Sequence, residues 1–201
     1  MGRRIRGRPI GVNAPGDSTR AAFLDAARGG ELPMTITMYQ ASVPTLVKHL
    51  EALRHILTKG ETFAKEKGLQ PDDLLQARIA PDMYPLTRQV QIASDMAKAT
   101  VARLSGQDAP SYADDEVSFE DLHARIAKTV EYLNGFSAAD IDGSEEKPIT
   151  LKFPNGEFNF TGQEYLLGFV LPNLYFHCAT AYGILRGKGV PLGKMDFFGM
   201  A

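Results

Sequence analysis

A histidine and an asparagine lie four residues apart in an apolar segment near the end of the chain. In the stretch PNLYFHCATAYGILR, the residues Asn173, His177 and Thr180 recur at helical spacing. Residues at i, i+4 and i+7 share one face of a helix, so these three groups can reach one place. Imidazole binds metals and moves protons, whereas amides and hydroxyls supply hydrogen bonds. The spacing therefore indicates a partial metal site, a hydrogen-bonding site, or polar groups satisfied within a core.

A second helical segment carries polar residues that could face the same place. Gln91 and Asp95 are four residues apart, and Arg88 precedes Gln91 by three. Side chains at these spacings share a helix face. If that face turns inward, it offers an amide, a carboxylate and a guanidinium to the cavity that holds Asn173 and His177. The alternative is a solvated face with one ion pair.

The other histidines are isolated from one another along the chain. His49 and His123 border apolar faces, whereas His55 lies on a more polar side of its segment. No two histidines are four residues apart and no His-Glu-x-x-His motif occurs, so hydrogen-bonded core histidines are favoured over metal ligands. Cys178 follows His177 directly, and adjacent helical residues point about 100° apart. We therefore interpret Cys178 as a buried core residue rather than as half of a thiolate–imidazole pair.

Four long helices are expected to position these residues. Apolar residues recur at helical spacing over about 38–67, 85–104, 118–134 and 161–186, with a short connecting helix over 72–79. Pro172 should kink or break the last helix. The alternating stretch PITLKFPNGEFNF predicts a β-hairpin near 148–160 around an Asn-Gly turn. The fold class is therefore all-α, a four-helix bundle with a long crossover that carries a small β-hairpin.

The first 33 residues differ from the rest of the chain. They hold six arginines against three acidic residues, a balance of +3, and the remaining 16 Lys+Arg against 21 Asp+Glu give −5. We expect residues 1–33 to be a disordered basic extension and residues 34–201 to be the bundle domain. The stretch STRAAFLDAAR resembles the start of a TetR-type repressor but ends before any recognition helix. An over-extended start of the chain is favoured over a basic tail with a partner of its own.

Composition excludes several classes of function. The acidic body argues against binding to a nucleic-acid backbone, and no apolar run approaches the length of a membrane span. The chain has 1 cysteine, which rules out an internal disulfide and multi-cysteine metal sites. We expect a soluble, cytoplasmic protein.

Three stretches carry a resemblance to a known family. MYQASVPTL, LLQARIAPDMYPLTRQVQIASDMAK and the segment from FPNGEFNF to MDFFG resemble the DinB-like (YfiT-like) four-helix bundles, and within them the domain-of-unknown-function 1993 branch. The resemblance covers about residues 35–199. It implies a nickel or zinc site in many members, built from one histidine of the second helix and a His-x-x-x-His pair of the fourth. It also implies thiol-dependent transferase or isomerase activity in some members, and a tendency to form homodimers.

Carried onto this sequence, the resemblance places the second histidine of the pair at His177, the first at Asn173, and the second-helix ligand near Gln89 or Gln91. Amides are much weaker ligands for zinc and nickel than imidazole. We therefore expect no cofactor and a polar pocket formed by Gln89, Gln91, Asn173 and His177 in place of the metal triad. One alternative is a metal-dependent thiol transferase or isomerase that uses His177 with His49 or His123. Another is a non-catalytic stress or interaction protein in which the polar groups only fix the register of the helices.

Overall fold

The computed structural model describes residues 36–154 and 156–200. The described residues from Ile36 onward form one compact unit. The expectations for residues 1–33, a disordered basic extension with a TetR-like start, lie outside the described residues.

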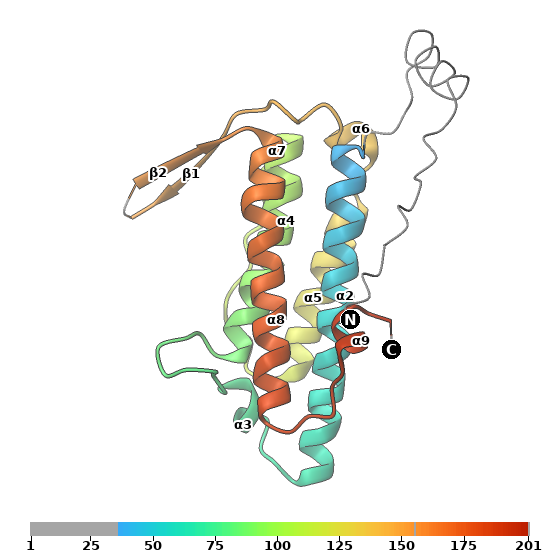
Figure 1. The fold of residues 1–201 in the computed structure, drawn as a ribbon, viewed down its shortest axis with the longest axis vertical. Helices are drawn as coiled ribbons and strands as arrows, with labels where there is room; N and C mark the ends of the chain where they lie inside the picture. The colour runs from blue at the N-terminus through green and yellow to red at the C-terminus, as the bar shows by residue number, and fades with distance from the viewer. Residues whose placement is uncertain (1–35, 155, 201) are drawn as a thin grey trace, which may run out of the picture. The chain divides into compact units, whose positions relative to one another are not determined.

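Four long helices form a closed bundle, which confirms the fold class expected from the sequence (Figure 1). They are α2 (Met38–Lys67), α4 (Leu86–Ser105), α5 (Phe119–Asn134) and α8 (Leu171–Gly187). Helix α4 packs against α5 and α8, and α2 packs against the same two helices on the other side. Short helices complete the described fold: α3 (Asp72–Leu75), α6 (Ala138–Ile141), α7 (Gly162–Glu164) and α9 (Lys194–Phe197).

The bundle core consists of the apolar stripes that the helical spacing predicts. Leu46, Leu50, Leu53 and Leu57 of α2 are almost completely buried, as are Leu86 and the small residues that follow it on α4. Burying one such leucine contributes about 1.5–3 kcal/mol relative to leaving it in water. The same burial fixes which face of each helix turns inward.

Helices α4 and α5 run in the same direction, so the chain must return along the bundle between them (Figure 1). Residues 107–117 make this return without regular secondary structure. The later connection, which carries the hairpin, joins the end of α5 to α7 at one end of the bundle. An irregular segment of this length needs contacts of its own to hold it on the bundle.

The hairpin consists of β1 (Ile149–Phe153) and β2 (Gly156–Phe160). The antiparallel register pairs Phe153 with Gly156, so Gly156 belongs to the second strand. The hairpin projects from the end of the bundle that carries α7 (Figure 1). The apolar residues of both strands lie on one face, where Leu151 pairs with Phe158.

Pro172 was expected to kink or break the last helix, and helical structure continues through it after an irregular, π-helical turn. A π-helical segment over Tyr165–Val170 joins α7 to α8, and Pro172 lies in the first turn of α8. The N–H of Leu171 donates to the carbonyl of Leu166, five residues earlier. Proline lacks an N–H and crowds the carbonyl of the preceding turn, and a wider turn accommodates both effects.

The C-terminal helix α9 lies against α2 and is held there by one buried carboxylate. Asp196 accepts hydrogen bonds from His55 Nε2 and Lys59 Nζ, each at 2.8 Å. Burial alone would raise the pKa of Asp196, but hydrogen bonds from the Gly193 N–H, Lys59 and His55 outweigh it and hold that pKa well below its usual range. No helix in the described part of the chain is long and apolar enough to cross a membrane.

Candidate functional site

The structure brings together Gln89 of α4 and His177 of α8. The Nδ1 atom of His177 lies 2.7 Å from the side-chain oxygen of Gln89, across the contact between the two helices. Gln89 is 1% exposed and His177 is 8% exposed. Buried polar side chains need hydrogen-bond partners, and this hydrogen bond gives Gln89 and His177 a partner in each other.

The second hydrogen bond of Gln89 fixes the tautomer of His177. The Gln89 amide nitrogen donates to the backbone carbonyl of Tyr84 at 2.9 Å, so the amide oxygen must be the atom that faces the ring. An amide oxygen only accepts, and His177 Nδ1 must therefore carry the proton and donate it. In the neutral ring, Nε2 is then the nitrogen with the free lone pair.

The surroundings of His177 favour its uncharged form. Burial lowers the pKa of the imidazole, and the positive charge of Arg88 lowers it further. Nε2 makes no hydrogen bond to the described residues, and it is not among the fully buried side-chain atoms that lack a partner. The site therefore presents one unprotonated ring nitrogen as a hydrogen-bond acceptor.

Asn173 lies one helical turn before His177 but does not contact Gln89. Its side-chain nitrogen donates to the carbonyl of Phe169 on the same helix, at 2.7 Å. This bond orients the amide and leaves its oxygen as a second acceptor on the face of α8 that carries His177.

Gln91, the other amide proposed for the pocket, lies in a different cluster. It accepts a hydrogen bond from Arg88 at 3.0 Å and donates to Glu116 of the return segment at 2.8 Å. Gln89 and Gln91 are separated by about 200° around α4, so only one of them can face α8. The structure therefore brings two of the four proposed pocket residues, Gln89 and His177, into direct contact.

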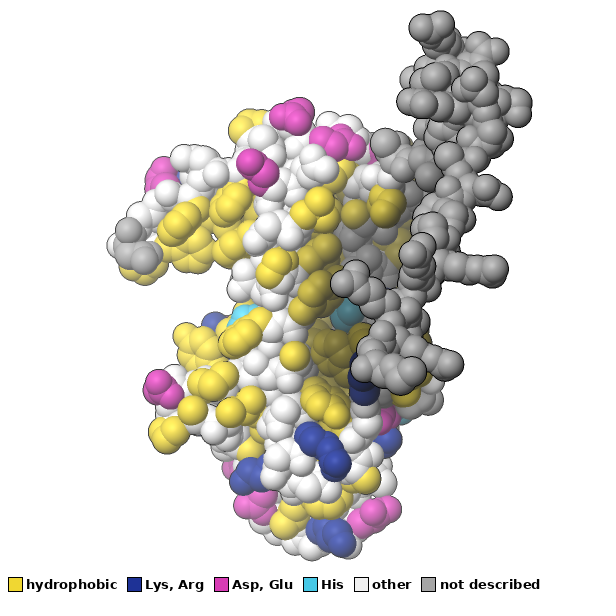
Figure 2. All heavy atoms as spheres, in the orientation of Figure 1, with side chains coloured by type: hydrophobic (Ala, Val, Ile, Leu, Met, Phe, Trp, Pro, Cys, Tyr) yellow, Lys and Arg dark blue, Asp and Glu magenta, His cyan; other side chains and the backbone are white. Residues whose placement is uncertain are grey.

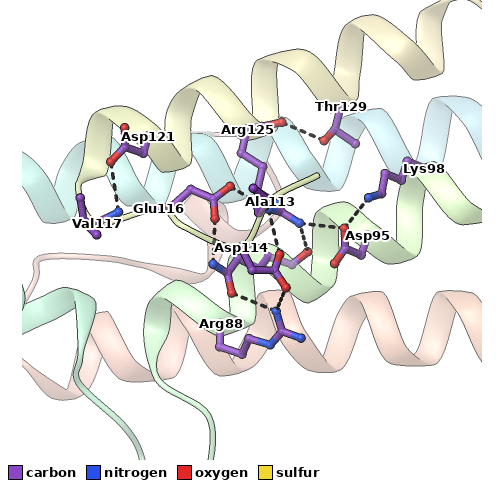
Figure 3. Close-up of polar contacts among 11 residues, drawn as sticks. Arg88, Asp95, Lys98, Ala113, Asp114, Glu116, Val117, Asp121, Arg125 and Thr129 are labelled. Atoms are coloured by element: carbon purple, nitrogen blue, oxygen red, sulfur yellow. Dashed lines mark hydrogen bonds and ion pairs between the residues drawn. The ribbon is translucent and has the colours of Figure 1, made fainter. Parts of the chain in front are cut away.

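The cluster around Gln91 is centred on Arg125 of α5 (Figure 3). The Arg125 side chain is 2% exposed and contacts Asp95, Asp114 and Glu116 at 2.7, 3.1 and 2.7 Å. It also donates to the carbonyl of Ala113 at 2.9 Å. Burial alone would lower the pKa of Arg125, but the three carboxylates outweigh it and raise that pKa.

We call this set the Arg125 cluster, and it ties three segments together. Asp95 belongs to α4, Arg125 belongs to α5, and Asp114 and Glu116 belong to the return segment between these helices. The Tyr112 ring of the same segment lies within 4.0 Å of Lys98 Nζ and 4.3 Å of Lys128 Nζ. Beside it is an open depression of about 460 Å³, lined mainly by the return segment and α5. We infer that the cluster holds the return segment in place.

The remaining histidines make contacts of their own. His49 packs against Tyr175 and Phe197, with ring centroids at 4.8 and 6.4 Å, and His123 lies 3.7 Å from Glu61.

Within residues 36–154 and 156–200, no three His, Cys, Asp or Glu side chains are grouped closely enough to hold a metal ion. The residues at the position implied for the metal do not fit a triad, because Asn173 and Gln89 already use their amides in hydrogen bonds within the protein.

Cys178 is a buried, inert thiol. Its side chain is enclosed in the core, and burial raises the pKa of the thiol to about 12. Only thiolates are good nucleophiles, so Cys178 is unsuited to covalent chemistry near neutral pH.

The sequence reasoning missed Arg125 and the carboxylates of the return segment. The helical spacing of α5 could have indicated Arg125, because it follows Leu122 by three residues and precedes Thr129 by four. The structure buries all three side chains. A charged residue on the apolar face of a helix predicts a buried ion pair. Its partners could not be named from sequence, because residues 107–117 have no periodicity that fixes their path.

The Arg125 cluster yields a prediction on stability. Arg125→Met keeps most of the side-chain volume but leaves three carboxylates without their shared cation, and should lower the free energy of unfolding by about 3 kcal/mol. The matched control is Lys128→Met, which removes an exposed cation that also contacts the Tyr112 ring and should cost less than about 1 kcal/mol. Urea unfolding of both variants measures the difference. Equal stability of the two variants would show that the cluster does not hold the return segment.

The sequence matches the family described as "Domain of unknown function (DUF1993)" over residues 38–198. The structure is similar to the crystal structure of a DinB family member protein from Shewanella denitrificans, with 44% sequence identity and a TM-score of 0.73. That similarity covers 80% of this chain and 90% of the other. No curated protein matches the sequence.

The match to the family extends from the first residue of α2 to the end of α9, and so includes the helices that carry Gln89 and His177. The bundle and its small hairpin have the DinB-like fold. The chain belongs to the DUF1993 family.

Proposed function

We propose that this protein is a DinB-like bundle that has lost the metal triad implied by the family resemblance and uses Gln89 and His177 as a metal-free binding site for a small molecule. The observation that supports it most is the pair of hydrogen bonds made by Gln89, which fixes the proton of His177 on Nδ1 and leaves Nε2 free. A neutral imidazole with a free nitrogen can accept a hydrogen bond from a ligand, or act as a general base toward it. A metal-dependent transferase built on His177 with His49 or His123 finds no support in the contacts of these histidines.

Metal content and titration test this proposal together. The untagged protein, produced with added nickel and zinc, should contain well under one equivalent of either metal. The ring signals of His177 should titrate below the ordinary value of about 6.5. Because folding lowers the pKa of His177, the contribution of this residue to stability is complete above its ordinary pKa of about 6.5. The contribution is lost as the pH falls from there through the lowered pKa of the folded protein.

A gain-of-function variant provides the positive control. Gln89→His combined with Asn173→His places imidazoles at the positions that the family resemblance implies for the missing ligands. This double variant should bind about one equivalent of zinc or nickel. Stoichiometric metal in the native protein that disappears in His177→Ala, but not in His123→Ala, would overturn the proposal.

We also propose that the protein forms a homodimer in the cytoplasm, with the hairpin contributing to the interface. Phe153 and Phe158 at the free end of the hairpin are about half exposed, as is Leu167 on the neighbouring π-helical segment. Figure 2 shows apolar side chains on the hairpin and along α8. The apolar face of the hairpin carries no charge, whereas Lys152 and Glu157 pair on the opposite face at 3.3 Å. Ile149 and Leu151 of this face are already buried, so Phe153 and Phe158 at its free end are the part that a partner would cover.

Two glutamate substitutions distinguish the loss of this interface from a general effect of added charge on dimerisation. Phe158→Glu introduces a charge on the apolar face and should convert the dimer to a monomer in analytical ultracentrifugation. Thr150→Glu introduces the same charge on the polar face and should leave the dimer intact. A native protein that sediments as a monomer, or a Phe158→Glu variant that remains dimeric, would contradict the proposal.

A further inference from the structure

The outer face of the last long helix carries no charged residue. No Asp, Glu, Lys or Arg occurs between Glu164 and Arg186, a stretch that includes the π-helical segment and most of α8. A helix that covers a bundle core normally turns charged side chains to solvent. Helix α2 does so, with Lys48, Arg54 and Lys65 exposed. The outer face of α8 therefore differs from an ordinary solvated helix surface.

A row of apolar residues at heptad spacing runs along this face, and we call it the α8 seam. It consists of Phe169, Pro172, Phe176, Ala179 and Gly183. Pro172, Phe176 and Ala179 are exposed, and Phe169 and Gly183 are partly buried. Apolar residues at alternating intervals of three and four are typical of a helix that packs along another helix. The α8 seam therefore has the pattern of a helix–helix contact on a solvent-facing surface.

The apolar surface continues beyond both ends of the α8 seam. At one end, the Phe153 ring of the hairpin lies 6.4 Å from the Phe169 ring and 5.6 Å from the Phe158 ring, between centroids. At the other end, a side-chain carbon added at Gly183 would lie 3.3 Å from Ile79 Cδ1. The hairpin and the segment between α3 and α4, which contains Ile79, project on the same side of α8 (Figure 1).

The exposed apolar area matches what a stable dimer needs. Phe153, Phe158, Phe176 and Ile79 are each 43–57% exposed. A whole aromatic side chain has about 150–250 Å² of surface, so these residues and the smaller ones of the α8 seam offer roughly 500 Å² per copy. A standard interface buries about 800 Å² per partner, a little more than half of it apolar.

The charges and sizes along the α8 seam fit a second copy of the chain. No charge opposes contact of the seam with itself. Phe169 and the hairpin rings make one end bulky, whereas Ala179 and Gly183 at the other end are small. Antiparallel packing across a two-fold axis places large residues of each copy against small residues of the other. A lipid surface fits less well, because the 16 Lys+Arg and 21 Asp+Glu of residues 34–201 make this part of the chain acidic.

We propose that the homodimer forms through its α8 seams, which pack antiparallel with Phe176 near the two-fold axis. Phe158 of each hairpin then contacts Ile79 of the partner subunit. This inference rests on the proposed homodimer and goes beyond it, because it names the central helix of the interface and the orientation of the two copies.

A charge at the centre of the α8 seam tests the choice of helix. Phe176→Glu brings two like charges together and should raise the dissociation constant of the dimer by about a hundredfold in analytical ultracentrifugation. The matched control is Val117→Glu, which adds the same charge at an exposed apolar residue of the return segment and should leave the dissociation constant unchanged. If Phe176→Glu does not fold, Ala179→Glu at an exposed residue of the seam replaces it. A seam variant that dimerises as tightly as the native chain overturns the proposal.

Charge complementation tests the orientation. Phe158→Glu alone should weaken the dimer, and adding Ile79→Lys should restore it to within about tenfold of the native dissociation constant, because each new acid then meets a new base of the other copy. Adding Leu69→Lys, at an exposed residue beyond the end of α2, should not restore it. Equal rescue by the two lysines, or no rescue by Ile79→Lys, overturns the antiparallel arrangement.

The outcomes separate this inference from the homodimer on which it rests. A native chain that sediments as a monomer contradicts both. A native dimer that dissociates in Phe158→Glu but not in Phe176→Glu contradicts only the α8 seam. A monomer that cosediments with vesicles of phosphatidylcholine and phosphatidylglycerol, and loses this binding in Phe176→Glu, shows that the seam contacts lipid and overturns the proposal.

Discussion

The arrangement of α4, α5 and the segment between them depends on the ion pairs of one buried guanidinium, that of Arg125. Helices α4 and α5 run in the same direction, so the chain between them must return along the bundle as an irregular segment. Arg125 joins Asp95 of α4 to Asp114 and Glu116 of that segment from a position that is almost inaccessible to water. Loss of one partner of an ion pair at such a depth strongly destabilises a protein. We therefore infer that the cluster holds the return segment against α4 and α5.

The same cluster lies on the side of α4 away from His177. Arg88, Gln91 and Asp95 turn toward the Arg125 cluster, in agreement with the rotation of α4 that the burial of its apolar residues sets. Gln89, on the other side of the helix, is thereby directed at His177. The chemistry of the site follows from this rotation, because Gln89 rather than Gln91 sets the tautomer of the histidine.

Much of the fold could be predicted from the sequence, and the reasons are physical. The apolar spacing that marks α2, α4, α5 and α8 is the same spacing that buries their side chains, so pattern and structure have one cause. Pro172 signals an irregularity in the last helix, but local chemistry does not show that this irregularity takes the form of a π-helical turn. In the site, His177 could be identified from its place on an apolar helix face. The choice between Gln89 and Gln91 depends on helix rotation, which residues distant in sequence decide.

We propose that hydrogen bonds within the protein replace metal ligation at His177. The most direct measurement is a long-range ¹H–¹⁵N correlation spectrum of the histidine rings at neutral pH, with His177 assigned from His177→Phe. We expect a neutral His177 ring protonated on Nδ1 with a bare Nε2, and loss of that single tautomer in Gln89→Leu. A ring protonated on Nε2, or one whose nitrogen shifts show a bound metal, would contradict it.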